Sequence, residues 1–515
     1  MNIHTKPQIV WSTQQGAFIK WAVTGKGSCV LVAVAGAGKT TVLLEAARQM
    51  PGQVAICAYN REIGNEIKAK LETMGVDWKK AQAGTVHSFG FKAYKKAFPK
   101  AVVSENNSKV RDLFADLFDL MSPEFPYQDA IVALVSMAKQ RALGVVTPVE
   151  DTQAWIDIIE KYEIADAGEY PAPSIDMLIR AARKLLEASN RQTSIIDFDD
   201  MVYLPLVHKV RFWCYDVVII DEAQDTNPAR RALLRAMLKR NGRLIAVGDK
   251  SQAIYSFCGA DSDSLDEIKR AFNCIEMPLT VSFRCPKAVV SFARQWADHI
   301  VAADTAIEGS VETKTLEEIL AEPALLNSDA AVICRNTKPL IDLFFMLLRR
   351  RIPARIEGRD VGASLKKLAT RWSSIKTINA LEEKLGDYLE KQRAKLLAKK
   401  QESRVQVLED TVDAIIAICA QCRLEGSSRV DDVVVSIDSM FGDNVTGRLT
   451  LSTIHKAKGR EWTRVLWLDR AGTCPSPWAE SAEAQQQESN LCYVGATRAK
   501  VQLIDVTVPP KKKDR

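Results

Sequence analysis

Short apolar runs recur along the chain, and each is followed by a loop or by a stretch with helical spacing. The runs are Cys29–Val34, Val54–Tyr59, Val217–Ile220, Leu244–Val247, Val332–Cys334, Leu449–Ser452, Val465–Leu468 and Leu503–Val506. Continuous apolar runs of this length are typical of strands that are buried on both faces of a parallel sheet. Strands that alternate with helices predict an α/β fold, with a doubly wound parallel sheet and helices on both of its faces.

The runs fall into two groups, and a mainly helical stretch interrupts each group. The chain has 515 residues, which is longer than the about 100–200 residues of a typical domain. We therefore expect two α/β domains, each with a helical insertion. The expected bounds are 1–90 with 195–280 for the first domain, 91–194 for its insertion, 281–373 with 446–515 for the second domain, and 374–445 for its short insertion.

Composition narrows the class of protein. Hydrophobic residues make up 47% and charged residues 26%, which is the balance of a globular protein and excludes a mostly disordered or collagen-like chain. Lys plus Arg is 70 and Asp plus Glu is 64, so the net charge is 70 − 64 = +6. Such a small net charge permits a polyanionic partner without requiring one, because local patches decide nucleic-acid binding.

The cysteines and the apolar segments indicate the compartment. Eleven cysteines stand without regular spacing, and an odd number does not fit a closed disulfide framework. The N-terminus has no apolar signal-peptide core, and no segment reaches the about 18 uninterrupted apolar residues of a membrane span. We expect a soluble, intracellular, cytoplasmic protein with reduced thiols and no membrane partner.

The strongest chemical signal is a glycine-rich loop between the first apolar run and the apparent helix Thr41–Met50. Its sequence AVAGAGKT covers residues 33–40 and fits the phosphate-loop pattern except for Ala33, where the pattern has Gly. Backbone N–H groups of such a loop wrap a phosphate, helped by the positive end of the following helix. The residues expected to bind ATP here are Ala35, Gly36, Ala37, Gly38, Lys39, Thr40 and Thr41.

Two residues of this loop have specific expected roles. Lys39 would reach the β- and γ-phosphates, and Thr40 would hold Mg²⁺ through its hydroxyl group. A chance Gly-Lys-Thr is common, so a plain strand–turn–helix is the alternative. The strand before the loop and the helix after it weaken that alternative.

A second chemical signal follows the apolar run that ends at Ile220. The sequence DEAQD at residues 221–225 places carboxylates at the C-terminal end of a buried strand, which is where ligands bind in open α/β sheets. Asp221 would complete the Mg²⁺ site, and Glu222 would orient or activate the attacking water. Acids after a strand also cap helices, with Asp225 or Asn227 as the better caps. Beside a phosphate loop, the pair predicts an ATPase that uses ATP and Mg²⁺.

Further motifs stand in order around this pair. WSTQQ at residues 11–15 precedes the phosphate loop, and AYN at 58–60 and GTVHSFG at 84–90 follow it. IDFDDM at 196–201 and VGDKSQAIY at 247–255 lie on either side of DEAQD. The second half of the chain adds SFRC at 282–285, TIHKAKGREW at 453–462 and YVGATRA at 493–499.

This ordered series resembles the superfamily 1 DNA helicases of the UvrD/Rep/PcrA type, over most of the chain. The resemblance implies two RecA-like motor domains. It also implies that the catalytic set comprises Lys39, Asp221, Glu222, Gln252, Arg284 and Arg498. In the family, the residue matched by Gln15 reads adenine, Phe283 stacks on adenine, and Glu461 meets the ribose. Gln252 would sense the γ-phosphate, Arg284 would face it, and Arg498 would be an arginine finger.

The resemblance also implies a DNA-binding set. The matching positions are Asn60, Thr85, His87, Phe89, Tyr255, Phe257, Thr453 and His455. Phe257 stands where the family usually has Trp, and any aromatic face can stack on a base. Cys258 stands where the family usually has Arg, so one phosphate or DNA contact is missing from the pattern. Each aromatic taken alone is more often a core residue.

The predicted function is an ATP-driven translocase on single-stranded DNA that unwinds tailed duplex DNA, without sequence specificity and, by resemblance, from 3′ to 5′. One rival is a DNA-stimulated ATPase that strips or remodels protein–DNA complexes with little unwinding. Another is an effector subunit that uses ATP as a switch within a larger assembly. A protein partner in repair, replication or defence stays open.

Two further segments have alternatives. The charged segment 381–404 is either a basic surface for nucleic acid or, as we favour, a solvated helix with opposite charges in neighbouring turns. Cys419 and Cys422 have the spacing of half a metal site, but no second pair stands nearby. Residues three apart on a helix share a face, which favours a structural role for both thiols.

Overall fold

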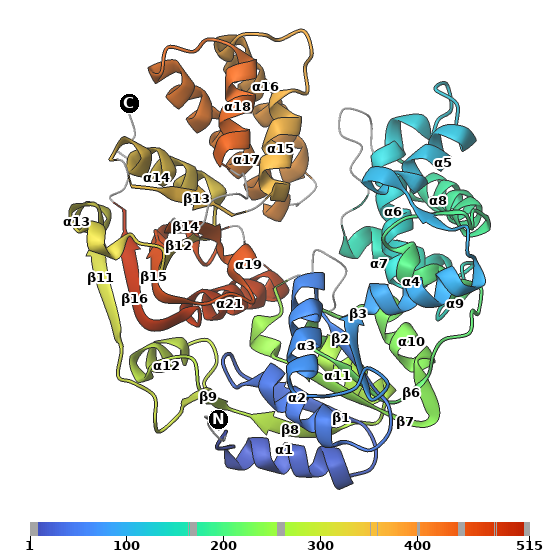
Figure 1. The fold of residues 1–515 in the computed structure, drawn as a ribbon. Coiled ribbons are helices and arrows are strands. Elements are labelled where there is room, and N and C mark those ends of the chain that lie inside the picture. The colour runs from blue at the N-terminus through green and yellow to red at the C-terminus, as the bar shows by residue number, and fades with distance from the viewer. Residues whose placement is uncertain are drawn as a thin grey trace. The chain divides into compact units, whose positions relative to one another are not determined.

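The computed structural model divides the chain into two compact units (Figure 1). It describes residues 9–162, 164, 173–254, 263–350, 352–357, 359–398, 402–440, 449–477, 479 and 481–508. The first unit comprises Met1–Val34 and Gly38–Leu279, and the second comprises Ala35–Ala37 and Thr280–Arg515. Each unit is built on a six-stranded parallel sheet, so the predicted fold class is confirmed.

The sheet of the first unit has the strand order β3-β2-β6-β7-β1-β8. Its strands are β1 Cys29–Ala33, β2 Val54–Ala58, β3 Ala81–Thr85, β6 Tyr215–Ile220, β7 Leu238–Gly248 and β8 Ile275–Leu279. Successive side chains of a strand point to opposite faces, and both sets are buried here: Val218 and Ile219 are each 0% exposed. Helices therefore cover both faces of the sheet. They are α1 Thr13–Thr24, α2 Lys39–Gln49, α3 Arg61–Thr73, α10 Pro228–Ala236 and α11 Ser264–Ala271.

A helical segment lies between β3 and β6, and we call it the first insertion. Its elements are α4 Val86–Ala97, β4 Val102–Val103, α5 Lys109–Leu117, α6 Gln128–Gln140, α7 Thr152–Lys161, α8 Ile175–Arg191, β5 Ile195–Ile196 and α9 Asp200–Val207. It has an apolar core of its own, around Phe114, Leu134 and Trp155. The sheet has a second core that includes Val218 and Leu244, and Val86 of α4 and Val202 of α9 also belong to it.

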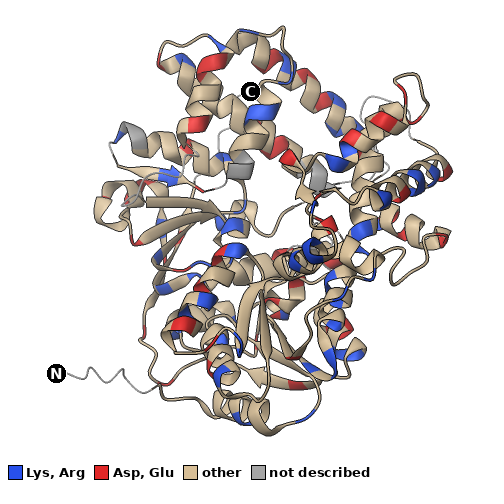
Figure 2. Ribbon diagram, turned by 45° about the vertical axis from the view of Figure 1, so that its right-hand side comes forward, with Lys and Arg blue, Asp and Glu red and all other residues tan. Residues whose placement is uncertain are grey.

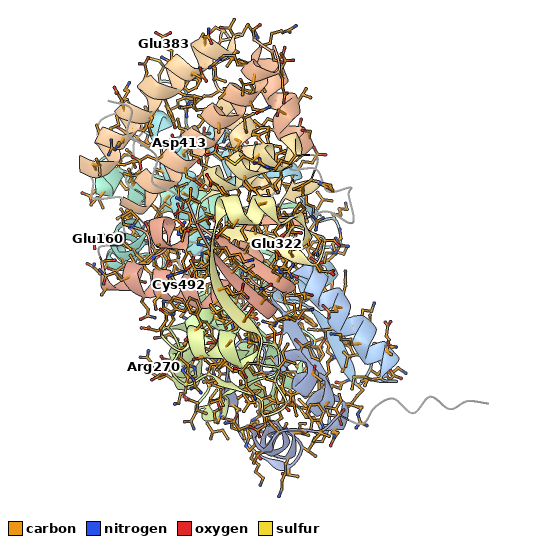
Figure 3. All side chains as sticks on the ribbon, turned by 90° about the vertical axis from the view of Figure 1, so that its left-hand side faces the viewer. Glu160, Arg270, Glu322, Glu383, Asp413 and Cys492 are labelled. Carbon is orange, nitrogen blue, oxygen red and sulfur yellow. The ribbon has the colours of Figure 1, made fainter. Side chains whose placement is uncertain are left out.

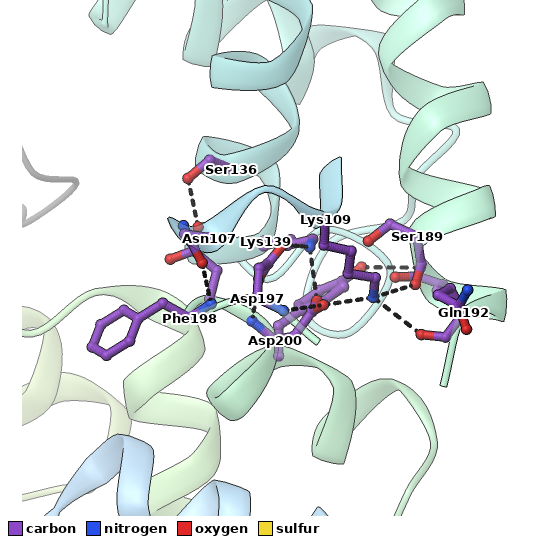
Figure 4. Close-up of polar contacts among 12 residues, drawn as sticks. Asn107, Lys109, Ser136, Lys139, Ser189, Gln192, Asp197, Phe198 and Asp200 are labelled. Atoms are coloured by element: carbon purple, nitrogen blue, oxygen red, sulfur yellow. Dashed lines mark hydrogen bonds and ion pairs between the residues drawn. The ribbon is translucent and has the colours of Figure 1, made fainter. Parts of the chain in front are cut away.

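A buried ionic cluster ties the helices of the first insertion together (Figure 4). Lys139 Nζ lies 2.5 Å from Asp197 Oδ2 and 2.7 Å from Asp200 Oδ1, and Lys109 Nζ lies 2.6 Å from Asp200 Oδ2. Lys109 also donates to the backbone carbonyl of Ser189, on α8. The side chains of Lys139 and Asp200 are 0% exposed, so these charges are compensated by one another and by hydrogen bonds instead of by water.

The sheet of the second unit has the strand order β11-β16-β15-β12-β14-β13. Its strands are β11 Ser310–Thr315, β12 Ala330–Cys334, β13 Ala354–Ile356, β14 Leu449–Thr453, β15 Trp462–Leu468 and β16 Ala499–Thr507, and β9 Val281–Ser282 pairs separately with β10 Val301–Ala302. The accompanying helices are α12 Lys287–Ala293, α13 Leu316–Ala321, α14 Thr337–Arg349, α19 Ile454–Ala457, α20 Arg470–Thr473 and α21 Ala482–Ala496. Figure 3 labels Cys492, on α21.

A second helical segment, the second insertion, lies between β13 and β14. It comprises α15 Arg359–Ala369, α16 Ile378–Ala398, α17 Glu402–Leu424 and α18 Val430–Met440. Its buried residues, such as Leu385 and Ile415, belong to the same apolar core as Val332 and Leu451 of the sheet. Among the described residues, this insertion therefore shares the core of the second sheet. Glu383 on α16 and Asp413 on α17 mark it in Figure 3.

The charged segment 381–404 lies mostly on α16, and its helix is half-buried instead of fully solvated. Leu381 and Leu385 are each 0% exposed. Its charged residues form pairs with the neighbouring helix α17: Arg393 lies 3.0 Å from Glu409, and Glu382 pairs with Arg423. Basic and acidic residues are both scattered over the helices (Figure 2). The sequence predicted ion pairs between neighbouring turns of one helix, whereas these ion pairs join α16 to α17.

Cys419 and Cys422 lie on α17, and their thiols belong to the apolar core of the second unit. Burial raises the pKa of Cys419 to about 12, so its thiol is held in the neutral form. No helix in the described ranges is long and apolar enough to cross a bilayer.

Candidate functional site

The predicted phosphate loop joins the C-terminal end of β1 to the N-terminus of α2. Gly36 and Gly38 both have φ of +73°, a left-handed conformation that glycine adopts without the steric cost of a Cβ atom. Gly38 is the N-cap of α2, and Lys39 and Thr40 are its first residues. The helix therefore begins two residues earlier than the sequence predicts. Its free N–H groups and positive end provide the anion-binding geometry expected of this loop.

The predicted carboxylate pair lies at the C-terminal end of β6, which is an inner strand of the sheet. Asp221 is 5% exposed, and burial and the neighbouring Glu222 raise the pKa of Asp221 from 3.8 to about 6. Glu222 has φ of +52°, an uncommon conformation for a residue with a side chain, and such positions are enriched in active sites. The pair thus places a buried and a partly buried carboxyl group side by side.

Lys39 faces the carboxylate of Glu222. Its Nζ lies 3.8 Å from Glu222 Oε1, and its side chain is 12% exposed. The structure thus brings the loop lysine and the strand carboxylate together, although 183 positions separate them in the sequence. No group of three or more His, Cys, Asp and Glu side chains with metal-site geometry occurs among the described residues.

Gln15 lies beside the loop. A Cβ atom added to Gly38 would stand 3.0 Å from Gln15 Nε2, so the amide of Gln15 packs against the end of the loop. Its Oε1 accepts a hydrogen bond from the backbone N–H of Ser12 at 3.0 Å, as part of the capping box of α1. The capping box holds Gln15 in place, and its predicted contact with adenine stays a prediction.

Gln252 lies on the short 3₁₀ helix η4 Lys250–Gln252, just after the C-terminal end of β7. It is 4% exposed, and its Nε2 donates to Asp249 Oδ2 at 2.6 Å. Asp249 is itself 1% exposed, and burial raises its pKa. Asp249 and Gln224 are buried polar residues at this site to which the sequence analysis gave no role. The signal was present, because Asp249 directly follows the inner strand β7 and Gln224 stands four residues after the inner strand β6.

The predicted nucleotide residues of the second unit are partly paired with one another. Arg284 Nε lies 2.5 Å from Glu461 Oε2, and Lys500 Nζ lies 3.7 Å from Glu461 Oε1. Burial alone would raise the pKa of Glu461, but the charge and hydrogen bond of Arg284 outweigh it and lower the pKa. Phe283 is 47% exposed, so its ring is accessible to a planar ligand.

Arg498 is 1% exposed and follows α21. Its guanidinium donates to the backbone carbonyls of Val494 and Arg460, at 2.9 and 3.1 Å, and to Thr497 Oγ1 at 3.0 Å. The planar fork is thus held rigidly from several directions, which limits the side-chain entropy that a further contact would cost.

The polar members of the predicted DNA-binding set cap helices. Asn60 accepts from the N–H of Ile63 at 2.8 Å, Thr85 from Ser88 at 3.1 Å, and Thr453 from Lys456 at 3.4 Å. Each follows or ends a strand and precedes a helix, so each stands at a helix N-terminus on the C-terminal edge of its sheet. Such termini favour phosphate groups.

The predicted DNA-stacking residues of the first unit differ in accessibility. His87 stacks on Phe198, with ring centroids 4.1 Å apart, and Phe198 is 51% exposed. Burial and the charge of Arg230 lower the pKa of His87 to about 3, so its imidazole is neutral. Phe89 packs edge-on against Tyr215 and contacts the core of the sheet, which favours a packing role.

A pocket in the first unit connects the two predicted sides of the site. Its walls include the carboxylates of Asp221 and Glu222 as well as Tyr59 and His87. The nucleotide and DNA sides therefore share one cavity wall. In the second unit, burial and the charges of Arg335 and Lys458 lower the pKa of His455 to about 3. Tyr255, Phe257 and Cys258 lie outside the described residues.

Comparisons with known proteins agree with this arrangement. The family model described as the UvrD/REP helicase N-terminal domain matches residues 11–273, and the UvrD-like helicase C-terminal domain matches residues 363–507. A probable DNA helicase II homolog of Mycoplasma pneumoniae is 26% identical over 315 residues, which cover 57% of this chain and 43% of the relative.

Two other similar proteins cover different shares of the chain. The ATP-dependent DNA helicase UvrD2 of Mycobacterium tuberculosis is 23% identical over 563 residues, which cover 93% of this chain and 76% of the relative. The ATP-dependent DNA helicase Rep of Escherichia coli is 21% identical over 273 residues, which cover 49% of this chain and 38% of the relative. The chain thus spans less than half the length of some of its relatives.

Proposed function

Because the chain belongs to the UvrD/Rep family of helicases, we propose that it is an ATP-driven translocase that moves along single-stranded DNA and unwinds duplex DNA. The observation that carries the proposal is the contact of Lys39 with Glu222, next to the buried Asp221, at the end of an inner strand. The proposed direction, 3′ to 5′, rests on the resemblance to the family.

The phosphates of ATP would bind at the N-terminus of α2. There, backbone N–H groups donate to the phosphate oxygens, and Lys39 would leave Glu222 to contact the β- and γ-phosphates. Thr40 and Asp221 would hold Mg²⁺, which neutralises the phosphate charge when it is bound. Its positive charge would also compensate the buried carboxylate of Asp221.

Glu222 would then orient the attacking water and accept its proton. Gln252 would contact the γ-phosphate side of the site. By the resemblance to the family, Arg284 and Arg498 would supply positive charge for the transferring phosphoryl group, Phe283 would stack on adenine, and Glu461 would meet the ribose. The neutral His87, the exposed Phe198 and the helix N-termini capped by Asn60, Thr85 and Thr453 support a DNA surface that is read without sequence specificity.

The first test is ATP hydrolysis with and without single-stranded DNA, in the native chain and in Glu222→Gln. We expect strong stimulation by DNA and a loss of about 100-fold or more in kcat for Glu222→Gln, since a general base contributes about 10²–10⁴-fold. Asp129→Asn, which alters an 86% exposed side chain of the first insertion, is the matched control. A hydrolysis rate that DNA leaves unchanged would remove the autonomous-helicase proposal.

Adenine stacking can be tested at Phe283, because this ring is exposed. We expect Phe283→Ala to raise KM for ATP about 2- to 10-fold, which corresponds to the about 0.5–1.5 kcal/mol of an aromatic contact. Phe283→Tyr keeps the ring and should keep KM. If Phe283→Tyr and Phe283→Ala raise KM equally, the ring does not stack on the base.

Strand separation on duplexes with a 3′ or a 5′ tail tests the unwinding and its direction. We expect unwinding only with the 3′ tail. Displacement of a protein from DNA without strand separation would favour a remodelling ATPase. Slow, DNA-independent hydrolysis would favour an ATP-switched subunit.

A further inference from the structure

Gln224 lies between the carboxylate of Glu222 and the strand end that leads to Gln252. It stands in the middle of the 3₁₀ helix η3 Ala223–Asp225 and is 1% exposed. Its Nε2 donates to Glu222 Oε2 at 2.5 Å, and its Oε1 accepts from the backbone N–H of Asp249 at 3.1 Å. Both ends of the amide group are therefore occupied.

The neighbours of this amide define its orientation. A carboxylate only accepts hydrogen bonds and a backbone N–H only donates one. The Nε2 end must therefore face Glu222 and the Oε1 end must face Asp249. A flipped amide would place two acceptors together at Glu222 and two donors together at Asp249, at the cost of both bonds.

The connection continues beyond Asp249. Asp249 Oδ1 accepts from the N–H of Ser251 at 3.0 Å, and its Oδ2 accepts from Gln252 Nε2 at 2.6 Å. Glu222, Gln224, Asp249 and Gln252 thus form one chain of hydrogen bonds. Because Gln224, Asp249 and Gln252 are each no more than 4% exposed, water competes little for these bonds.

Packing also holds Gln224 in position. A Cβ atom at Gly248 would lie 2.5 Å from Gln224 Oε1 and 3.1 Å from Leu265 Cδ2. The absence of a side chain at Gly248 therefore leaves the space that the amide occupies. Glu222 itself has a left-handed backbone at φ of +52°, so a side-chain contact is well placed to define where its carboxylate points.

We propose that Gln224 is a positioning residue for ATP hydrolysis: it holds the Glu222 carboxylate and couples its orientation to the Asp249–Gln252 segment. A shift of Gln252 on nucleotide binding would move Asp249 and, through the Gln224 amide, Glu222. Lys39 contacts Glu222 on another oxygen, so Gln224 keeps hold of the carboxylate when Lys39 turns to the phosphates. The inference rests on the proposed function of Glu222.

The first variant is Gln224→Met, which has a similar length and lacks both hydrogen-bonding groups. We expect kcat for DNA-stimulated hydrolysis to fall about 10- to 100-fold, the loss that a small misplacement of a reacting group produces. KM for ATP should stay within about 2-fold, since the proposed role of Gln224 is exerted through Glu222 and not through the nucleotide. Binding of a fluorescent ATP analogue and the melting temperature show whether the variant is folded.

The second variant is Gly248→Ala, which displaces the amide of Gln224 without removing it. We again expect kcat to fall while KM for ATP stays unchanged, and we expect a smaller fall in kcat than in Gln224→Met. Gly386→Ala is the matched control, because a Cβ atom at Gly386, on α16, meets no atom within 4 Å. Its kcat should equal that of the native chain.

A double variant tests the coupling. If Gln224 acts through the hydrogen bonds that lead to Gln252, the double variant Gln224→Met/Gln252→Ala should lose about as much kcat as the worse single variant. The reason is that the effects of residues that act as a unit are not additive. Losses that multiply would contradict the coupling. A native kcat in folded Gln224→Met would overturn the positioning role.

The two proposals can fail separately. A native chain that hydrolyses no ATP would overturn the proposed function, and the inference with it. A native chain with DNA-stimulated hydrolysis that Glu222→Gln abolishes, together with unaffected Gln224→Met and Gly248→Ala variants, would overturn only the inference.

Discussion

The two helical insertions differ in how their apolar cores are related to the core of the adjoining sheet and in how far their ion pairs are buried. Most buried apolar residues of the first insertion form a core distinct from that of its sheet, although a few, such as Val86 and Val202, belong to the core of the sheet. Buried charges of Lys109, Lys139 and Asp200 also tie its helices together. The second insertion shares one continuous apolar core with its sheet, through residues such as Ile415 and Leu451. Ion pairs within it, such as that of Arg423 with Glu382, are partly exposed.

This difference has a consequence for local stability. Segments with separate cores can open separately, whereas residues of one core exchange with solvent together. We therefore expect the first insertion to unfold locally without its sheet, and the second insertion to open only together with β12 and β14.

The largest effect is expected at the buried ionic cluster. Asp200→Asn removes the carboxylate that Lys109 and Lys139 share, and an uncompensated buried charge costs about 3–5 kcal/mol. Hydrogen exchange followed by mass spectrometry should show faster exchange in α6 and α8. Asp129→Asn breaks the exposed pair with Arg111 and should cost no more than about 1 kcal/mol. Equal effects of both variants would contradict the importance of burial.

A pair of core truncations tests the two cores directly. Leu134→Ala in α6 and Ile415→Ala in α17 each remove a side chain that is 0% exposed, at a cost of about 2–5 kcal/mol. We expect Ile415→Ala to accelerate exchange in β12 as well as in α17. Leu134→Ala should accelerate exchange in the first insertion and leave β6 protected. Loss of protection in β6 would mean that the first unit has one cooperative core.

A pH-dependent effect is expected at Asp199, whose Oδ2 accepts from Ser136 Oγ at 2.5 Å. Burial, followed by the charge of Asp197, raises the pKa of Asp199 from 3.8 to about 6. The folded state therefore binds a proton more tightly than the unfolded state, and this group's contribution to stability falls as pH rises from about 4 to about 6.

Asp199→Asn removes that charge and keeps an oxygen that can accept from Ser136. Relative to the native chain, the variant should gain stability as pH rises through this window, and the gain should level off above about pH 6. Urea unfolding of both proteins between pH 5 and pH 8 measures it. A constant difference across this range would contradict the raised pKa.

The smallest effect is expected at the ion pairs of the second insertion. Glu382→Gln removes the partner of Arg423, which is 48% exposed, so the cost should be no more than about 1 kcal/mol and should decrease with added salt. Urea unfolding at low and high salt measures it. A salt-independent cost of several kcal/mol would mean that charge, as well as apolar burial, holds this insertion.

The sequence predicted inner strands better than edge strands. Each of the predicted runs forms an inner strand of one of the two six-stranded sheets. The edge strands of these two sheets, β3, β8, β11 and β13, were not predicted. An inner strand of a parallel sheet is buried on both faces and reads as a continuous apolar run. Edge strands such as β3, with sequence AQAGT, and β11, with SVETKT, are paired on one side only and carry polar residues.

Much of the candidate site was predictable because its chemistry depends on local geometry. A strand that turns through Gly36 and Gly38 into a helix has the same conformation wherever it occurs, and Asp221 follows its strand directly. The roles of Asn60, Thr85 and Thr453 as helix caps were missed, although the pattern of strand, capping residue and helix was present in the sequence.

The sequence by itself determined the parallel α/β architecture, the phosphate loop and the ordered motifs, because each depends on a few neighbouring residues. Only the tertiary structure decided that Lys109 and Lys139 are buried, that the second insertion shares the core of its sheet, and that Gln224 connects Glu222 to Asp249. Each of these depends on residues that are distant in the chain, and a side chain's environment is determined by what the fold places against it.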